Sequence, residues 1–194
     1  MALPPPHRKR MQRREVPRGV RFITCSCQRR LPLLRNPAIC LIFVEAMARA
    51  RAKFSLEIFA WVLMPEHIHL LLRPPEHGDF APALKSLKLS VSMRVIARWR
   101  EIDAPVLARI TDGHGRPRYW QKGGGFDRNV RDEHEFRKEV RYIHRNPLER
   151  ELVERPEDWR WSSVRWWMGR REGEFPCDPP PRDPAAWAGW EGFK

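Results

Sequence analysis

Two histidines separated by one residue, His67 and His69, lie inside an apolar run that alternates as a β-strand does. Alternation along a strand places both imidazoles on one face and directs Ile68 to the opposite, buried face. Two imidazoles on one face can offer two nitrogen ligands to a single divalent metal ion. The pair therefore predicts half of a metal site, and a purely structural role for both histidines is the alternative.

A tyrosine and an asparagine four residues apart, Tyr142 and Asn146, stand near the end of a predicted helix. Asp132 suits the N-cap, the helix should run to about His144, and Asn146 followed by Pro147 should end it. If the last turn stays helical, Tyr142 and Asn146 share a face about 5–6 Å apart at Cβ, presenting a hydroxyl and an amide oxygen together. His144 should point away from both, as a partner of the helix dipole or a DNA contact. The alternatives are a tyrosine that anchors the helix and an ordinary helix end.

Cations and aromatic residues are interleaved between Arg116 and Lys122, a mixture suited to phosphates and stacked bases. The candidate DNA-binding residues, chosen by charge and position, are Arg116, Arg118, Trp120, Gln121, Lys122 and Arg128. For Trp120 and Gln121 the alternative is simple packing and hydrogen bonding. The glycines after Lys122 could form a flexible loop instead of binding a phosphate.

The composition narrows the class of protein. The chain has 194 residues, of which 42% are hydrophobic, which suits one domain with a real core and some appendages. Lys and Arg outnumber Asp and Glu by 37 to 24, and the formal net charge of +13 favours nucleic acid as partner. No run approaches the roughly 20 apolar residues of a membrane span. We expect a soluble cytoplasmic protein that associates with the nucleoid and has no membrane partner.

The hydrophobic pattern predicts three strands and two long helices in the order β-α-β-β-α, over residues 20–28, 37–53, 56–63, 67–73 and 80–100. This order suggests an α+β fold, a ferredoxin-like or RRM-like antiparallel sheet with helices on one face. The second helix should expose a basic face. Residues 101–131 are expected to be irregular and Gly-rich. Cys25 and Cys27 are expected to be buried strand residues, because no paired cysteine spacing indicates a metal or disulfide framework.

Three segments differ in composition. Residues 1–19 are rich in Pro and Arg and predict a flexible basic arm that either contacts phosphates or is a solvated tail. Residues 20–168 should form the one folded domain. Residues 169–194 form an Arg-, Pro- and Trp-rich tail that could fold back through Trp187 and Trp190 or lie loose and bind DNA or a partner.

The segment from His67 to His69 resembles the histidine-hydrophobe-histidine motif of the HUH-class single-strand tyrosine transposases. Later motifs resemble the branch of that class associated with repetitive extragenic palindromes (REP). They occur in the expected order, at residues 119–121, 126–128, 142–147, 157–159 and 161–163. The resemblance spans residues 18–168.

The resemblance implies a chemistry and a set of residues for it. Tyr142, on a helix late in the chain, would be the nucleophile that attacks a DNA phosphodiester and leaves a 5′-phosphotyrosine and a free 3′-hydroxyl. His67, His69 and Asn146 would hold a divalent metal ion, and two imidazoles with one amide oxygen suit either Mg²⁺ or Mn²⁺. Such an enzyme cleaves and rejoins strands without ATP, because the covalent linkage conserves the phosphoester.

The resemblance also implies a partner, single-stranded DNA with a short hairpin from REP-like palindromic repeats, and leaves a monomer and a homodimer both open. Where family members have a small residue and a glycine before Leu-Val, this chain has Glu149, Arg150 and Glu151 before Leu152 and Val153, so the local turn after Pro147 need not follow the family pattern. Two other function classes remain. One is a domesticated, non-cleaving single-strand nucleic-acid-binding protein, and the other is a metal-dependent phosphodiesterase that uses water.

Overall fold

The computed structural model describes residues 19–74, 80–123, 125–170 and 173–182. The predicted basic arm up to Arg18 lies outside the described residues, as do Trp187 and Trp190 of the predicted tail. None of the helices in the described ranges combines the length and the apolar character that a membrane span requires.

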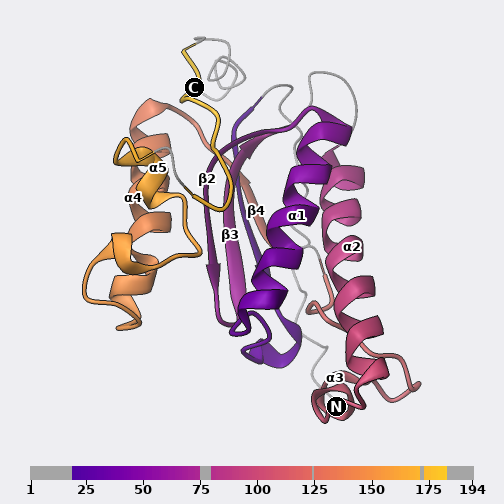
Figure 1. The fold of residues 1–194 in the computed structure, drawn as a ribbon. Helices are drawn as coiled ribbons and strands as arrows, with labels where there is room; N and C mark the ends of the chain where they lie inside the picture. Colours follow the sequence, from indigo (N-terminus) through magenta and orange to yellow (C-terminus); the bar gives the residue numbers. More distant parts are fainter. Residues whose placement is uncertain (1–18, 75–79, 124, 171–172, 183–194) are drawn as a thin grey trace, which may run out of the picture.

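A four-stranded antiparallel sheet forms the centre of the fold (Figure 1). Its strands are β1 (Arg21–Ser26), β2 (Glu57–Met64), β3 (His67–Arg73) and β4 (Phe126–Asn129), in the spatial order β2-β3-β1-β4. β2 and β3 form a hairpin, and β1 pairs with both β3 and β4. The three predicted strands are confirmed, with small shifts at their ends.

β4 corrects the expectation that residues 101–131 are irregular, and this part also contains the short helix α3 (Val106–Ile110). The sequence of β4 has no apolar alternation, so no local pattern indicates a strand. Its backbone pairs with β1, and Asp127 forms a buried ion pair with Arg21 at 2.8 Å, across 106 residues of chain. These partners are distant in sequence, which explains why the prediction was wrong.

Helices cover both faces of the sheet (Figure 1). Two of the three predicted helices are confirmed as α1 (Pro37–Phe54) and α2 (Phe80–Glu101), which lie side by side on one face. α4 (Glu133–Glu149) packs on the opposite face, and α5 (Val164–Trp167) lies beside it. Single 3₁₀ turns occur at Gln28–Arg30 and Pro156–Asp158. The α+β architecture with an antiparallel sheet is confirmed, but the expectation of helices on one face only is corrected, because α4 packs on the face opposite α1 and α2.

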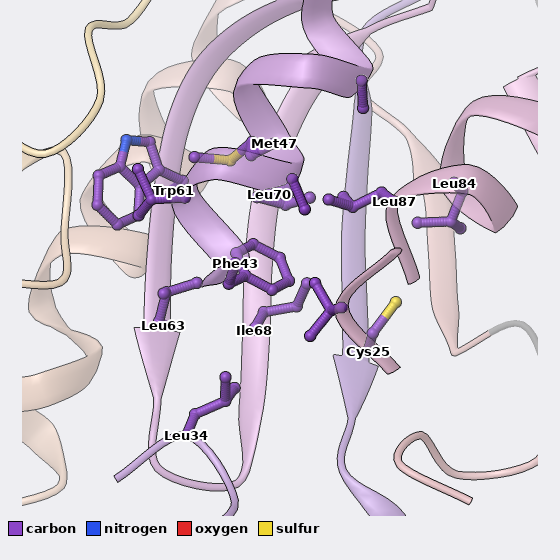
Figure 2. Packing of buried hydrophobic residues seen from close by; sticks show 14 of the residues in the cluster. Cys25, Leu34, Phe43, Met47, Trp61, Leu63, Ile68, Leu70, Leu84 and Leu87 are labelled. Carbon is purple, nitrogen blue, oxygen red and sulfur yellow. The ribbon is translucent and has the colours of Figure 1, made fainter. Parts of the chain in front are cut away.

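Alternation along the strands divides the core into two layers. On the side of α1, Ile68 and Leu70 of β3 pack with Phe43 and Met47 (Figure 2). The other layer lies between the sheet and α4 and includes Phe22, Phe136, Val140 and Ile143. The predicted burial of Ile68 is confirmed. His67 and His69 alternate with it and therefore lie on the α4 side.

The last turn of α4 differs from the prediction that Asn146 and Pro147 end the helix, because α4 continues to Glu149. Pro147 lacks the N–H that would reach the carbonyl four residues earlier. However, the amides of Arg150 and Leu152 bond to carbonyls of this turn at 3.1 and 3.0 Å, and Pro147 is buried. Packing and these later hydrogen bonds outweigh the loss of the hydrogen bond that Pro147 cannot donate, so Asn146 is helical.

The described part of the C-terminal tail folds back on the domain. Phe175 and Cys177 are buried in the layer beneath α1. The Asp178 carboxylate pairs with Arg51 of α1 at 2.6 Å and accepts a hydrogen bond from the Ile58 amide at 2.8 Å. Phe175 and Cys177 thus anchor the chain here, whereas the tryptophans suggested for this role lie outside the described residues.

All four cysteines are buried, which confirms the expectation for Cys25 and Cys27. Burial raises the pKa of Cys27, Cys40 and Cys177 to about 12 in each case. Because the thiolate is the reactive form, we expect the native protein to react negligibly with the thiol reagent DTNB at pH 8. The same protein in guanidinium chloride should react at all four thiols. Rapid stoichiometric reaction of the native protein would contradict this packing.

Candidate active site

A pocket of about 650 Å³ lies on the α4 side of the sheet, with walls from β1, β3, β4 and α4. It brings together all four residues predicted for catalysis and metal binding, His67, His69, Tyr142 and Asn146. The histidines come from β3, and the other two side chains come from one face of α4. The two halves of the predicted site therefore meet only because α4 crosses the sheet at this point.

The two histidines converge on one point. Their Nε2 atoms lie 3.0 Å apart, and the two rings are nearly perpendicular with centroids 4.7 Å apart. The Nδ1 atom of His69 contacts the Thr24 hydroxyl at 2.8 Å, and Nδ1 of His67 contacts a carboxylate oxygen of Glu66 at 3.1 Å. When each Nδ1–H donates to its oxygen partner, both Nε2 atoms carry lone pairs directed at the same place.

Burial keeps this pair uncharged. It lowers the pKa of His67, against the opposing effect of the Glu66 carboxylate, and it lowers the pKa of His69 to about 3 with a further contribution from His67. Both rings are therefore neutral near pH 7. Two lone pairs facing each other repel unless a proton or a cation lies between them, so this arrangement suits a shared metal ion.

Asn146 could supply a third donor. Its side chain is 6% exposed, and its amide oxygen has no hydrogen-bond partner among the described residues. A buried polar atom without a partner carries a desolvation cost, which coordination to a cation would remove. Within the described ranges, no cluster of three His, Cys, Asp or Glu residues could hold a metal. The fitting donor set is thus two imidazoles and one amide oxygen, which suits Mn²⁺ or Mg²⁺.

Tyr142 stands beside the histidines and is 41% exposed. Its ring meets the edge of the His69 ring with centroids 5.2 Å apart, and it meets Phe22 at 5.9 Å. Tyr119, the other tyrosine of the chain, is 1% exposed and lies in the core, where burial raises its pKa well above the ordinary value. Of the two tyrosines, Tyr142 is therefore the one placed to react with a ligand in the pocket.

Glu66 joins the end of α4 to the histidine pair, a link that sequence reasoning missed. The carboxylate oxygen that contacts His67 also accepts a hydrogen bond from Arg150 at 2.9 Å and lies 3.5 Å from Arg30. Arg150 belongs to the stretch where this chain departs from the family pattern. The only local signal was the position of Glu66 directly before His67.

Replacing Glu66 with Gln is expected to weaken binding of Mn²⁺ about 10- to 100-fold, because an amide holds the His67 ring less firmly than a carboxylate does. Isothermal titration calorimetry with MnCl₂ measures this. The matched control is Glu45→Gln, which removes a surface carboxylate paired with Arg94. Equal Mn²⁺ affinity in the wild type and Glu66→Gln would remove Glu66 from the site.

Of the predicted DNA-binding residues, only Arg128 lines this pocket, where it pairs with Glu135 and Glu139. Arg116 and Arg118 both contact Asp112, at 3.6 and 2.8 Å. They lie away from the histidines, so the structure does not bring them into the pocket.

Trp120 is buried beside Phe43, and its ring N–H donates to the Lys88 carbonyl at 3.0 Å. This favours the packing alternative over base stacking for Trp120. Gln121 and Lys122 line a neighbouring hollow that borders the pocket.

His144 points away from Tyr142, as predicted, but its burial argues against both roles suggested for it, a partner of the helix dipole and a DNA contact. It is 8% exposed, lies 2.9 Å from the Ser163 hydroxyl through Nε2, and contacts the Trp167 ring. Burial lowers the pKa of His144 to about 4, so it is neutral near pH 7 and carries no charge for the helix dipole. Its role is to connect α4 to the segment before α5.

The fold and the pocket together define a class of protein, an α+β domain that presents a histidine pair on a sheet opposite a tyrosine on a helix. A family model described as "Transposase IS200 like" matches residues 19–123. The chain belongs to this transposase family. The matched part includes His67 and His69 and ends before Tyr142.

Within this family the chain is similar to REP-associated tyrosine transposases. The protein of that name from Escherichia coli (strain K12) is 28% identical over 140 residues, which cover 69% of this chain and 68% of the relative. A Haemophilus influenzae protein given the same family name is 26% identical over 122 residues, covering 62% of this chain and 66% of the relative.

A solved structure, described as that of the REP-associated tyrosine transposase bound to a REP hairpin, supports the fold. It has a TM-score of 0.66 and 22% sequence identity, and the match covers 91% of this chain and 96% of the other.

Proposed function

We propose that this transposase is a metal-dependent single-strand DNA endonuclease and strand transferase that works through a 5′-phosphotyrosine on Tyr142. One observation carries the proposal: the Nε2 atoms of His67 and His69 converge beside the exposed Tyr142. The unpartnered oxygen of Asn146 supports it. Together, the imidazole lone pairs, the unpartnered amide oxygen and the tyrosine suit attack on a phosphodiester. The basic charge of the protein suits DNA as the substrate.

Tyr142 performs the covalent step. Its phenol loses its proton, and the phenolic oxygen forms a bond to phosphorus as the bond from phosphorus to the 3′-oxygen breaks. The departing 3′-oxygen takes up a proton. The DNA downstream of the cut then carries its 5′-phosphate on Tyr142, and the upstream DNA ends in a 3′-hydroxyl. Attack by a 3′-hydroxyl of another strand reverses the step and joins the two DNAs.

His67, His69 and Asn146 would hold the Mg²⁺ or Mn²⁺ ion. When bound, such an ion stabilises the negative charge that develops on the phosphate. Asn146 and Tyr142 are four residues apart on α4, so the helix that provides the nucleophile also provides a donor for the metal. Glu66 and Arg150 help to keep that helix in register with the histidines.

We propose single-stranded DNA with REP-like hairpins as the partner. The similarity to REP-associated relatives and the net charge of +13 support this assignment. Arg128, Gln121 and Lys122 are candidates for contacts near the pocket, and the basic arm up to residue 19 would add contacts that do not depend on sequence. Tyr142 contacts His69 of its own chain, so one chain carries the complete proposed site, whether the active unit is a monomer or a homodimer. Such an enzyme would act in the cytoplasm at the nucleoid.

A non-cleaving nucleic-acid binder is the competing function, because a binder could keep the basic and aromatic surfaces. It would have no need for converging imidazoles or an exposed tyrosine beside them. A phosphodiesterase that uses water would need the metal but would form no covalent adduct.

The test uses hairpin oligonucleotides tiled from palindromic repeats of the host genome, incubated with Mn²⁺, Mg²⁺ or EDTA and resolved on denaturing gels. A 3′-end label should mark a slow, protease-sensitive adduct, and a 5′-end label should mark a shortened strand. Added DNA with a free 3′-hydroxyl should be joined without ATP. Native complexes with no cut strand would favour the binder, and cutting with no adduct would favour the phosphodiesterase.

A further inference from the structure

A second hollow, of about 760 Å³, adjoins the pocket that holds Tyr142. The two share four lining residues, Thr24, Ser26, Arg30 and Phe126. We call these four the passage. The second hollow continues to Lys88, Gln121 and Lys122, which are polar or cationic. A path therefore leads from the nucleophile over the end of β1 toward the part of the chain rich in cations.

Phe126 is an exposed aromatic side chain within this passage. It begins β4, pairs with Thr24 of β1, and is 46% exposed. Its ring meets Phe22 edge-on with centroids 6.2 Å apart, and Phe22 in turn stacks on His69 at 5.4 Å. Phe22 therefore packs against both the Phe126 ring and the ring of His69, a proposed metal ligand.

Gly125 explains how Phe126 reaches this position. It has a φ of +78°, and a Cβ at this position would lie 2.1 Å from the carbonyl oxygen of Thr24. Only glycine permits so close an approach of this backbone to β1. The approach fixes the start of β4 against β1 and places the Phe126 ring over the passage.

Arg30 provides the cation of the passage. Arg30 and Arg29 both have left-handed backbone φ values, 52° and 53°, which are unfavourable for residues other than glycine. The Arg30 side chain is 61% exposed and its contact with Glu66, at 3.5 Å, is long. Most of its N–H donors are therefore available to a ligand, close to an exposed aromatic ring.

We propose that an unpaired nucleotide beside the cleaved phosphodiester stacks its base on Phe126 while its phosphate binds Arg30. This inference rests on the proposed function, since it names how the same site holds the strand. An aromatic ring accepts any base, because every base has a π face, and a guanidinium suits a phosphate. A base inside a duplex cannot stack in this way, so the passage would select unpaired DNA next to the cut.

The experiment places 2-aminopurine, a fluorescent base, at successive positions of the hairpin oligonucleotide. The Tyr142→Phe protein serves as the background, so that binding is measured without turnover. At one position the bound base should be more strongly quenched than in the complex of Tyr142→Phe combined with Phe126→Ala. Phe126→Tyr in the same background should restore the quenching. Affinity, from fluorescence anisotropy, should fall about 5- to 150-fold in Phe126→Ala.

Two further variants complete the design. Met93→Ala removes an apolar residue of α2 that is 63% exposed, and it should leave both quenching and affinity unchanged. Arg30→Gln should reduce the slope of log affinity against log salt by about 0.7, the value for one phosphate contact on a single strand.

The outcomes separate this inference from the proposed function. Binding with no position whose quenching depends on Phe126 would overturn the stacking site and leave the proposed function standing. An unchanged salt slope in Arg30→Gln would overturn the phosphate contact. Absence of binding by the Tyr142→Phe protein to any hairpin oligonucleotide would count against the proposed function itself.

Discussion

Replacing Tyr142 with Phe is expected to abolish strand cleavage and the covalent adduct, a loss of at least about 10³-fold, because it removes the attacking oxygen. The ring contacts with His69 and Phe22 remain, so the fold and the affinity for DNA should be close to those of the wild type. Denaturing electrophoresis with end-labelled hairpin DNA measures cleavage, and anisotropy measures binding.

Tyr119→Phe is the matched control for this experiment. Tyr119 lies in the core and donates a hydrogen bond to the Leu33 carbonyl at 3.3 Å, so the variant loses one weak bond and no part of the pocket. It should form the adduct at nearly the wild-type rate. Adduct formation by Tyr142→Phe would show that another nucleophile acts.

Replacing His69 with Ala should eliminate metal-dependent cleavage, lowering the rate by about 10²-fold or more. A bound cation stabilises the transition state by several kcal/mol, and each 1.36 kcal/mol changes the rate tenfold. Mn²⁺ binding, measured by calorimetry, should become too weak to detect. Because His69 is buried and neutral in the native protein, its removal exposes no unpaired charge, and the variant should fold.

His114→Ala provides the comparison, since His114 is an exposed histidine in a turn outside the pocket. It should keep both Mn²⁺ affinity and cleavage. Mn²⁺-dependent cleavage by His69→Ala at the wild-type rate would mean that the histidine pair is structural, which is the alternative that the sequence left open.

Local sequence patterns were sufficient to predict most of the strands and helices. β3 has the predicted bounds, and α4 begins as expected, with the Asp132 side chain accepting a hydrogen bond from the Glu135 amide at 2.7 Å. These features depend on neighbours within a few residues, which is the range over which alternation, helical periodicity and capping act. They are therefore readable from the sequence.

The end of α4 and the strand β4 depend on remote partners. Pro147 normally ends a helix, yet its burial and the hydrogen bonds of the following turn extend α4 to Glu149. The backbone of β4 pairs with β1, and Asp127 forms a buried ion pair with Arg21. The hydrogen bonds of the turn that follows Pro147 are local, but the burial of Pro147 and the pairing of Asp127 with Arg21 require segments distant in sequence, and these override local preference.

The sequence by itself determined the candidate chemistry: two imidazoles on one strand face, and Tyr142 with Asn146 one helical turn apart. Only the tertiary structure decided that these halves share a pocket, that burial keeps the histidines neutral, and that Glu66 and Arg150 connect them. Spacing along a strand or helix is fixed by local backbone geometry. Burial and the meeting of distant segments arise only when α4 packs across the sheet.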